Sequence, residues 1–362
     1  MEEKNKGDFD IPLLKVSGKN YGEIGQRVGA EFKDRIALAY ANRKKWIDRL
    51  VAFGEEDRAS RIDPFVRAIK EEFPHIWEEI EGLALGSEWP LDHMVAVILN
   101  PELTAMMKAE SAEEDCTTVA VASGEKLWIG HNEDGSCHYH DSMYMLDIGW
   151  PSGRRSLALS YPGYLPGNGP SINSAVVQTL NYIGASEVKP GIPRYVIDRA
   201  VMEAEDLDHA IRLAVHPRRA YSQHHTIMGI KEKRIVSVES GPVGHSLLQV
   251  DGMYGHANHF VHPAMRDTAQ IDTYGGSSGP RQEAADNWTK RTDPDEVTED
   301  DVMTFLRGHE QMPHSVCRHL EDNVPGCTLA SIFIGLGSGT IRVYAGEPCG
   351  FRFRDFAWPS PA

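Results

Sequence analysis

Apolar positions change their spacing about a third of the way along the chain. Before that point they recur every three or four residues, first over 20–40 and then through 41–110, which predicts helices. Gly22, Gly25 and Gly29 lie within the first predicted helix and indicate close packing against another element. Beyond this part, short β-branched and apolar runs alternate with turn signals, which predicts strands. Helices followed by strands, with no internal repeat, indicate an α+β fold.

The later part of the sequence predicts mostly antiparallel strands with a few helices. The strands are predicted at 143–150, 155–161, 172–180, 226–230, 235–239, 246–250, 329–336 and 339–344. The helices are predicted at 193–204, 206–215 and 295–307, and Asp206 is a suitable N-cap for the second of these. The stretch 264–291, with Gly and Ser concentrated near its middle, is predicted to be a long surface connection.

One predicted hairpin carries two reactive side chains. Residues 117–122 suit a buried strand, 123–125 form a turn signal, and 127–130 begin the partner strand. Cys116 stands at the head of the first strand, and Asp134 ends the second. A tight hairpin therefore brings these two residues to the same end of one sheet.

The segment before Cys116 predicts a site of chain cleavage. Residues 108–115 are polar, acidic and small, which is typical of an exposed loop that tolerates backbone cleavage. Cleavage before Cys116 would give its thiol a free α-amine on the same residue. An α-amine has a reference pKa of about 7.7–8.0, so it can act as general base at neutral pH. The alternative interpretation is a small, half-buried structural cysteine.

Cys116-Thr117-Thr118, followed by Asp134 at the end of the next strand, resembles the isopenicillin N acyltransferase family. These proteins are self-cleaving cysteine members of the N-terminal-nucleophile (Ntn) hydrolases. The resemblance implies a four-layer αββα sandwich of two antiparallel sheets flanked by helices. It also implies cleavage between Asp115 and Cys116. The family usually has glycine before the cysteine, so Asp115 is a departure from its pattern.

Cleavage there would give an α-chain of residues 1–115 and a β-chain of residues 116–362. The resemblance implies that the two chains remain associated as one folded domain. The released cysteine would be the nucleophile, and Asp134 would hydrogen-bond the α-ammonium group or a nearby backbone group.

The resemblance extends to other parts of the site. The stretch 256–259 matches a His-x-Asn-His motif, and its Asn258 would donate to the oxyanion. Ser222 is the nearest match to a serine that lines the family's site. The stretch 315–318 and the start of the strand at 328–329 also match. In the family's penicillin-processing member an arginine precedes that strand, whereas this sequence has Gly326 and Cys327 there.

The substrate prediction is a small N-acyl amine or amino-acid amide, with acyl-coenzyme A as a candidate acyl donor. Tyr161, Tyr164 and His224 lie in aromatic- and His-rich loops and are predicted to contact the acyl group. Hydrolysis and acyl transfer both remain open, because the outcome depends on whether the pocket excludes water while an amine is bound. Homo-oligomer formation also remains open.

Charge and composition narrow the classes of partner. The formal net charge of −16 argues against a nucleic-acid partner and an anionic membrane surface. No run approaches 18 apolar residues, and residues 1–8 lack the apolar segment of a signal peptide. Five cysteines without regular spacing do not predict a disulfide framework. We therefore expect a cytoplasmic enzyme without a cofactor or a metal ion.

Two alternatives stay open at this stage. The sixteen histidines include clusters that a metal-dependent amidohydrolase could use. The cluster residues are His131, Glu133, Asp134, His138, His140, His224, His225, His256, His259 and His262. No His-Glu-x-x-His motif occurs among them. The second alternative is an unprocessed, inactive ligand-binding homologue in which Asp115 blocks maturation.

Overall fold

The first third of the chain forms a layer of helices. The computed structural model describes residues 11–109, 114–268, 270, 276–320, 326–337 and 340–359. A short strand and successive helices open it: β1 (Leu13–Ser17), α1 (Tyr21–Glu31), α2 (Lys33–Asn42), α3 (Lys44–Glu56), α4 (Arg58–Arg61), α5 (Asp63–Glu72), α6 (Pro74–Ser87), α7 (Leu91–Ile98) and α8 (Asn100–Met106). The helix predicted at 20–40 is two helices, because the backbone leaves helical geometry at buried Phe32.

Glycines bring α1 and α6 into close contact, as the sequence predicted. A Cβ atom at Gly25 would lie 2.2 Å from the Glu79 carbonyl oxygen, and one at Gly82 would lie 2.0 Å from the Gly22 carbonyl oxygen. Any larger residue at these positions would push the two helices apart. The glycines therefore fix the spacing of the helical layer.

The larger sheet has eight strands in the order β1-β4-β5-β6-β7-β8-β9-β10. After β1 its strands are β4 (Tyr144–Gly149), β5 (Arg155–Ser160), β6 (Ser171–Asn173), β7 (Val176–Asn181), β8 (Gln223–Gly229), β9 (Arg234–Gly241) and β10 (Gly244–Gln249). All pairings are antiparallel except that β1 runs parallel to β4. The strand predicted at 172–180 is split in two, because the Asn173 side chain accepts hydrogen bonds from the next turn at Ala175 and Val176.

The smaller sheet has six antiparallel strands in the order β11-β2-β3-β12-β13-β14. Their bounds are β2 (Glu114–Ser123), β3 (Lys126–Ser136), β11 (Gly252–His256), β12 (Gly326–Gly335), β13 (Thr340–Ala345) and β14 (Phe353–Ala357). Two 3₁₀ turns, η1 (Cys137–Tyr139) and η2 (Pro348–Gly350), follow β3 and β13. The predicted hairpin at 116–134 therefore forms two neighbouring interior strands of this sheet, β2 and β3.

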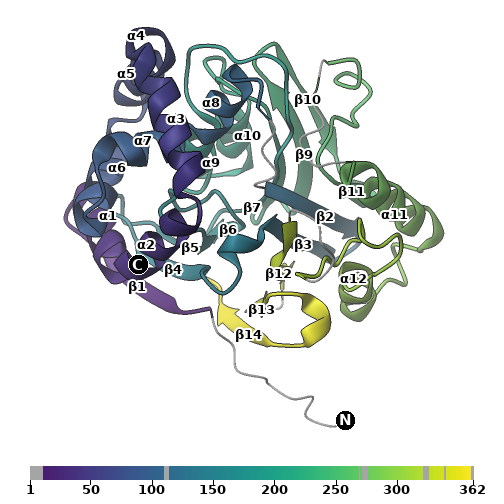
Figure 1. Ribbon diagram of the computed structural model, residues 1–362. Helices are drawn as coiled ribbons and strands as arrows, with labels where there is room; N and C mark the ends of the chain where they lie inside the picture. Colours follow the sequence, from purple (N-terminus) through teal and green to yellow (C-terminus); the bar gives the residue numbers. More distant parts are fainter. Residues whose placement is uncertain are drawn as a thin grey trace.

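The two sheets face each other between helical layers (Figure 1). Ala120 and Ile129 of the smaller sheet belong to the main core that it shares with the larger sheet. On its opposite face, Val119 and Val121 pack against the helices α11 (Ser278–Arg291) and α12 (Glu299–Leu306). The remaining helices, α9 (Arg194–Val201) and α10 (Leu207–Ala214), join the layer over the larger sheet. The α+β four-layer prediction is confirmed, apart from the parallel edge strand β1.

Two predictions for the later part of the chain, a helix cap and a surface connection, differ in outcome. Asp206 caps α10, since its side chain accepts a hydrogen bond from the His209 backbone N–H. In contrast, the predicted surface connection at 264–291 is wrong over its last part, which forms α11. This helix is polar and lacks an apolar period, so the sequence pattern gave no signal for it.

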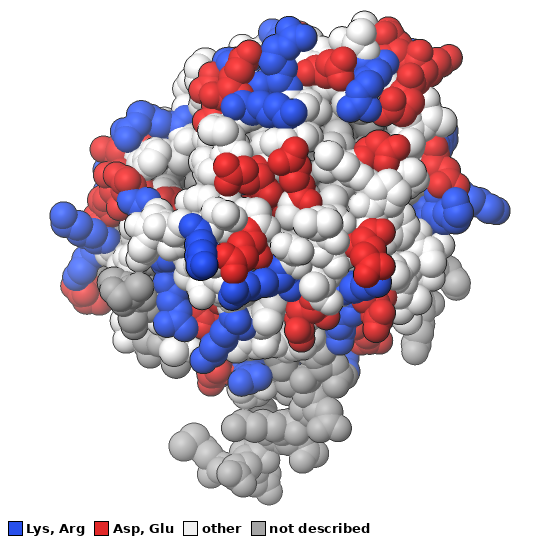
Figure 2. Space-filling view, turned by 90° about the vertical axis from the view of Figure 1, so that its left-hand side faces the viewer, with Lys and Arg blue, Asp and Glu red and all other residues white. Residues whose placement is uncertain are grey.

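The surface over the first helices is mixed in charge. Figure 2 shows acidic and basic side chains interspersed on this face rather than gathered by sign. Exposed ion pairs such as Lys33 with Glu88 and Arg218 with Glu71 join side chains of opposite charge at the surface of these helices. None of the described helices is both long and apolar enough to cross a bilayer. The stretch 1–8, where no signal peptide was predicted, lies outside the described residues.

Candidate active site

The β2–β3 hairpin positions the candidate residues on two faces of one sheet. In the register, Cys116 pairs with Glu133, and Asp115 pairs with Asp134. Side chains alternate between the faces of a strand. Cys116 and Glu133 therefore point toward the larger sheet, whereas Asp115 and Asp134 point toward α11 and α12. Cys116 and Asp134 do lie at the same end of the sheet, as predicted, but on opposite faces.

A carboxylate stands beside the cysteine sulfur. The Cys116 Sγ lies 3.6 Å from Glu133 Oε1, and Cys116 is only 3% exposed. The Tyr161 hydroxyl donates to the same oxygen over 2.7 Å, and His131 Nε2 lies 3.0 Å from the second oxygen, Oε2. The Thr118 hydroxyl in turn contacts His131 Nδ1 at 2.7 Å. Glu133 is therefore held in one orientation with an oxygen next to the thiol.

Sequence reasoning did not pair Glu133 with the cysteine. It placed Glu133 among candidate metal ligands and chose Asp134 as the partner of the nucleophile. The signal was nevertheless present, because alternation places the residue before Asp134, rather than Asp134 itself, on the face of Cys116.

The backbone nitrogen of Cys116 is held by Asn258. The Cys116 N–H donates to Asn258 Oδ1 over 2.9 Å, and Arg281 donates to the same oxygen over 2.8 Å. Asn258 Nδ2 donates to the Tyr182 carbonyl oxygen over 3.0 Å. In the uncleaved chain, Asn258 thus contacts the nitrogen that cleavage would release. Its predicted oxyanion contact would need Nδ2, so that role stays a prediction.

Asp115 is buried in strand β2 and paired with two arginines. Its carboxylate contacts the guanidinium groups of Arg281 and Arg318 and accepts a 2.6 Å hydrogen bond from Ser277. The prediction of an exposed loop is therefore wrong for Asp115, while 110–113 of the same stretch lie outside the described residues. The acidic residue is buried because arginines distant in sequence neutralise it.

Arg281, on α11, contacts both sides of the Asp115–Cys116 bond. Its fully buried guanidinium donates to the Cys116 carbonyl oxygen over 2.5 Å and to the Thr117 hydroxyl over 3.0 Å, besides pairing with Asp115. Sequence reasoning missed Arg281, because it lies in the stretch predicted to be a loop.

Arg318 provides a second guanidinium group next to Asp115. β12 begins with Gly326 and Cys327, at the place where the family's penicillin-processing member has an arginine. A Cβ atom at Gly326 would lie 3.4 Å from both terminal nitrogens of Arg318. The absence of a side chain at Gly326 therefore leaves room for Arg318 to reach Asp115.

Asp134 is fully buried near these two arginines. Burial raises the pKa of its carboxyl group to about 6, and the charges of Arg318 and Arg281 oppose the rise. Neither oxygen accepts a well-aligned hydrogen bond from the described residues. The predicted contact of Asp134 with the cysteine α-ammonium group is not made in the uncleaved chain, and that role stays a prediction.

The raised pKa of Asp134 predicts a pH-dependent stability. The ordinary pKa of 3.8 applies in the unfolded chain, so the folded chain binds the proton more tightly. The contribution of this proton to the free energy of unfolding is therefore complete below about pH 4 and is lost as the pH rises to about 6. In Asp134→Asn the side chain stays neutral, so we expect this loss, on the order of 2 kcal/mol, to disappear.

Denaturant unfolding at pH 4 and pH 7, in the Cys116→Ala background that keeps one chain, measures the difference. Asp300→Asn, at an exposed carboxylate on α12, is the control and should keep the parent's pH dependence. Equal pH dependence in the Asp134→Asn variant and its parent would refute the assignment.

The predicted substrate-contacting residues lie in different surroundings. Tyr161 lies at the site through its hydrogen bond to Glu133, and its ring packs 5.9 Å from that of Tyr164. Tyr164 also accepts a hydrogen bond from Arg43, and the Ser222 hydroxyl donates to the Ile183 carbonyl oxygen. Both are buried.

His224 lies buried in strand β8 rather than in the predicted loop, and it connects to the site through Asn181. Its Nδ1 lies 3.0 Å from Asn181 Oδ1, which also accepts a hydrogen bond from Thr118. Its ring stacks on that of His256 with centroids 3.4 Å apart, and burial together with the neighbouring histidines lowers its pKa. Asn181 thus links His224 of β8 to Thr118 of β2, the strand that carries Cys116.

Several of the histidines that a metal-dependent amidohydrolase could use contact separate carboxylates instead. His131 and Glu133 lie with Cys116 such that their ligand atoms are within 4.8 Å of one another. These three could approach one metal ion, yet His131 and Glu133 already contact each other. His256 pairs instead with Glu239 at 2.9 Å, and His140 with Asp141 at 2.9 Å.

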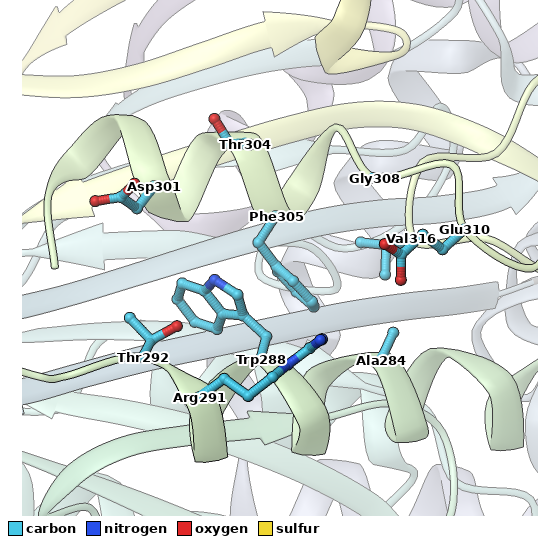
Figure 3. Close-up of a pocket in the computed structure, with 10 residues that line it drawn as sticks. All are labelled: Ala284, Trp288, Arg291, Thr292, Asp301, Thr304, Phe305, Gly308, Glu310 and Val316. Atoms are coloured by element: carbon cyan, nitrogen blue, oxygen red, sulfur yellow. The ribbon is translucent and has the colours of Figure 1, made fainter.

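A pocket of about 270 Å³ lies on the outer side of the smaller sheet, between α11 and α12 (Figure 3). Its wall includes the stacked rings of Trp288 and Phe305, with centroids 4.8 Å apart. None of the predicted site residues lines it. It therefore lies apart from the cysteine site.

Comparison with known proteins agrees with the resemblance seen in the sequence. A curated relative, the β-alanyl-dopamine/carcinine hydrolase of Drosophila melanogaster, is 24% identical over an alignment of 253 residues, and the match covers 64% of this chain. The match spans 65% of that relative, just under two thirds of its length.

Solved structures also match. An N-acylethanolamine-hydrolyzing acid amidase orthologue of Caenorhabditis elegans matches 67% of this chain and 100% of its own, with 13% identity and a TM-score of 0.42. A mutant conjugated bile acid hydrolase of Clostridium perfringens matches 67% of this chain and 92% of its own, with 11% identity and a TM-score of 0.44. The model of the family described as acyl-coenzyme A:6-aminopenicillanic acid acyl-transferase matches residues 121–349, more than half of the chain. The chain belongs to that family.

Proposed function

We propose that the chain cleaves itself between Asp115 and Cys116 and then acts as an N-terminal-cysteine amide hydrolase or acyltransferase. The observation that carries the proposal is the placement of Cys116 in the uncleaved chain. Its sulfur lies against the Glu133 carboxylate, and its nitrogen is held by Asn258. The nucleophile and the future base are therefore on Cys116 itself, the proton acceptor is the adjacent Glu133, and Asn258 holds the nitrogen.

Self-cleavage needs a base other than the α-amine, which is still part of a peptide bond. Glu133 Oε1 accepts the thiol proton, and Sγ attacks the carbonyl carbon of Asp115. The C–N bond then breaks, the nitrogen takes a proton, and Asp115 is held to the sulfur as a thioester. Water hydrolyses this thioester, which leaves the Asp115 carboxylate and a free Cys116 thiol and amine.

Asp115 is well anchored for this step. Its side chain pairs with Arg281 and Arg318, and Arg281 also binds the Cys116 carbonyl oxygen. These contacts hold both residues of the scissile bond while the sulfur attacks. They also keep the new end of the α-chain in place on β2 after cleavage.

In turnover the free α-amine replaces Glu133 as the base. It takes the thiol proton and returns it to the leaving amine, while Sγ forms a thioester with the acyl group of the substrate. Asn258 Oδ1, which contacts this nitrogen before cleavage, orients the amine. Water or an acceptor amine then takes the acyl group.

For the substrate we propose N-acyl derivatives of small amines, with β-alanyl amides as the first class to examine. The name of the Drosophila melanogaster relative states that it hydrolyses such amides. The processed protein is incubated with β-alanyl-dopamine, β-alanyl-histamine and their N-acetyl counterparts, and release of the free amine is followed. We expect release that is abolished by a thiol-alkylating reagent and unaffected by brief chelator treatment.

Two results would count against this function. Absence of amine release from every N-acyl amine would remove the substrate class. Release that resists alkylation but stops with chelator would favour the metal-dependent alternative. Replacing water with an acceptor amine and an acyl-coenzyme A donor in the same assay separates transfer from hydrolysis.

A further inference from the structure

Four potential metal ligands that take no part in the chemistry of Cys116 meet at one place. They are His309, Cys317, His319 and Cys349, and their ligand atoms all lie within 4.8 Å of one another. They come from the loop after α12, from the stretch before β12, and from the turn η2 between β13 and β14. The sequence spacing matches no compact zinc motif, so only the fold brings them together.

Three of the distances between these atoms match the edges of a zinc-centred tetrahedron to within about 0.2 Å, and the distance between the two imidazole nitrogens is about 0.4 Å shorter than its edge. Cys317 Sγ and Cys349 Sγ lie 3.8 Å apart, and His319 Nε2 lies 3.8 Å from the first and 3.5 Å from the second. The His319 and His309 Nε2 atoms are 2.9 Å apart. Zinc bonds of about 2.3 Å to sulfur and 2.0–2.1 Å to nitrogen give edges of about 3.8, 3.6 and 3.3 Å.

We propose that this quartet binds one Zn²⁺ ion in a structural Cys₂His₂ site. Two thiolates and two imidazoles in a tetrahedron are the donor set that Zn²⁺ prefers, and four protein ligands leave no position for a substrate. Binding displaces the two thiol protons. The proposal departs from the expectation of a metal-free protein, but it assigns the metal no part in the reaction.

The site fastens the segment that carries Arg318. Arg318 stands between Cys317 and His319, and its guanidinium pairs with Asp115 at the start of the cysteine strand. The same segment is held to its surroundings by hydrogen bonds from Cys317 N–H to the Gly308 carbonyl oxygen and from Arg318 N–H to the Thr328 hydroxyl. A metal at the quartet ties this segment to η2 and limits the movement of Arg318.

Metal content tests the proposal independently of any activity. The full chain, free of any affinity tag, is purified without chelator, and elemental analysis is expected to find about one zinc per chain. After removal of the metal and refilling with Co²⁺, we expect the visible absorption of a tetrahedral cobalt–thiolate site. Chelator treatment should also lower the melting temperature of the wild-type chain.

Variants at two of the ligands provide the contrast. His309→Gln, on an exposed loop, and Cys349→Ser should each weaken zinc binding at least about tenfold, and Cys349→Ser should also lower the intensity of the cobalt–thiolate absorption, because only the Cys317 thiolate remains. His314→Gln alters a histidine of the same loop outside the quartet and should keep the full metal content. Weaker zinc binding in both ligand variants, with unchanged binding in the control, would support the site.

Two outcomes would overturn the proposal. One is a wild-type chain that holds no zinc and takes up no Co²⁺. The other is an intact mass lower by two hydrogen atoms, with Cys317 and Cys349 linked as a disulfide. Neither outcome removes the thiol chemistry proposed above, because none of the four ligands takes part in it.

Discussion

Cys116→Ala is expected to remain a single chain of 362 residues and to lose amide-cleaving activity. The change removes the sulfur that attacks both the Asp115 carbonyl and the substrate, so neither thioester can form. The wild-type chain, in contrast, should yield fragments 1–115 and 116–362. Denaturing electrophoresis and intact mass measure the cleavage, and amine release measures the activity.

Cys137→Ala is the matched control for this experiment. Cys137 lies in η1 just beyond β3 and is half-buried. Among the described residues, the thiol that contacts Glu133 is that of Cys116, not that of Cys137. This variant should be cleaved and active like the wild-type chain. If Cys116→Ala is still cut between residues 115 and 116, the nucleophile has been misassigned.

Glu133→Gln is expected to slow self-cleavage by about 10²–10⁴-fold, the usual contribution of a positioned general base. Glutamine keeps the size of the side chain, and its carbonyl oxygen can still accept the Tyr161 hydroxyl hydrogen bond. It cannot take the thiol proton. The half-time of cleavage, followed on freshly purified protein, measures the effect.

Turnover per cleaved molecule should change much less in this variant, because the α-amine serves as base after cleavage. Glu125→Gln, at an exposed position in the turn of the same hairpin, should be cleaved at the wild-type rate. Equal loss of cleavage and turnover in Glu133→Gln would show that the carboxylate supports the structure of the site rather than the first proton transfer.

Part of the site could be predicted because it is local. Cys116 at a strand, the turn at 123–125 and the end of the next strand follow from apolar alternation and turn residues. The same alternation places Glu133 on the face of Cys116, whereas the resemblance to the family had indicated Asp134. Careful use of strand parity would have found the carboxylate beside the sulfur.

Other parts of the site left no local signal. Arg281 sits on a polar helix without an apolar period, and Asp115 occupies an acidic stretch typical of a loop. Each is buried because the other neutralises it, and 166 residues separate the two in the chain. Composition around either residue could not disclose the pair.

The sequence by itself determined the α+β class, the order of most helices and strands and the hairpin that carries Cys116, since these depend on spacings within a few residues. Only the tertiary structure decided the burial of Asp115, the approach of Arg281 and Arg318 to it, and the meeting of His309, Cys317, His319 and Cys349. Charges and ligands of this kind are stabilised by partners distant in the chain, and such pairing imposes no period on the residues that take part.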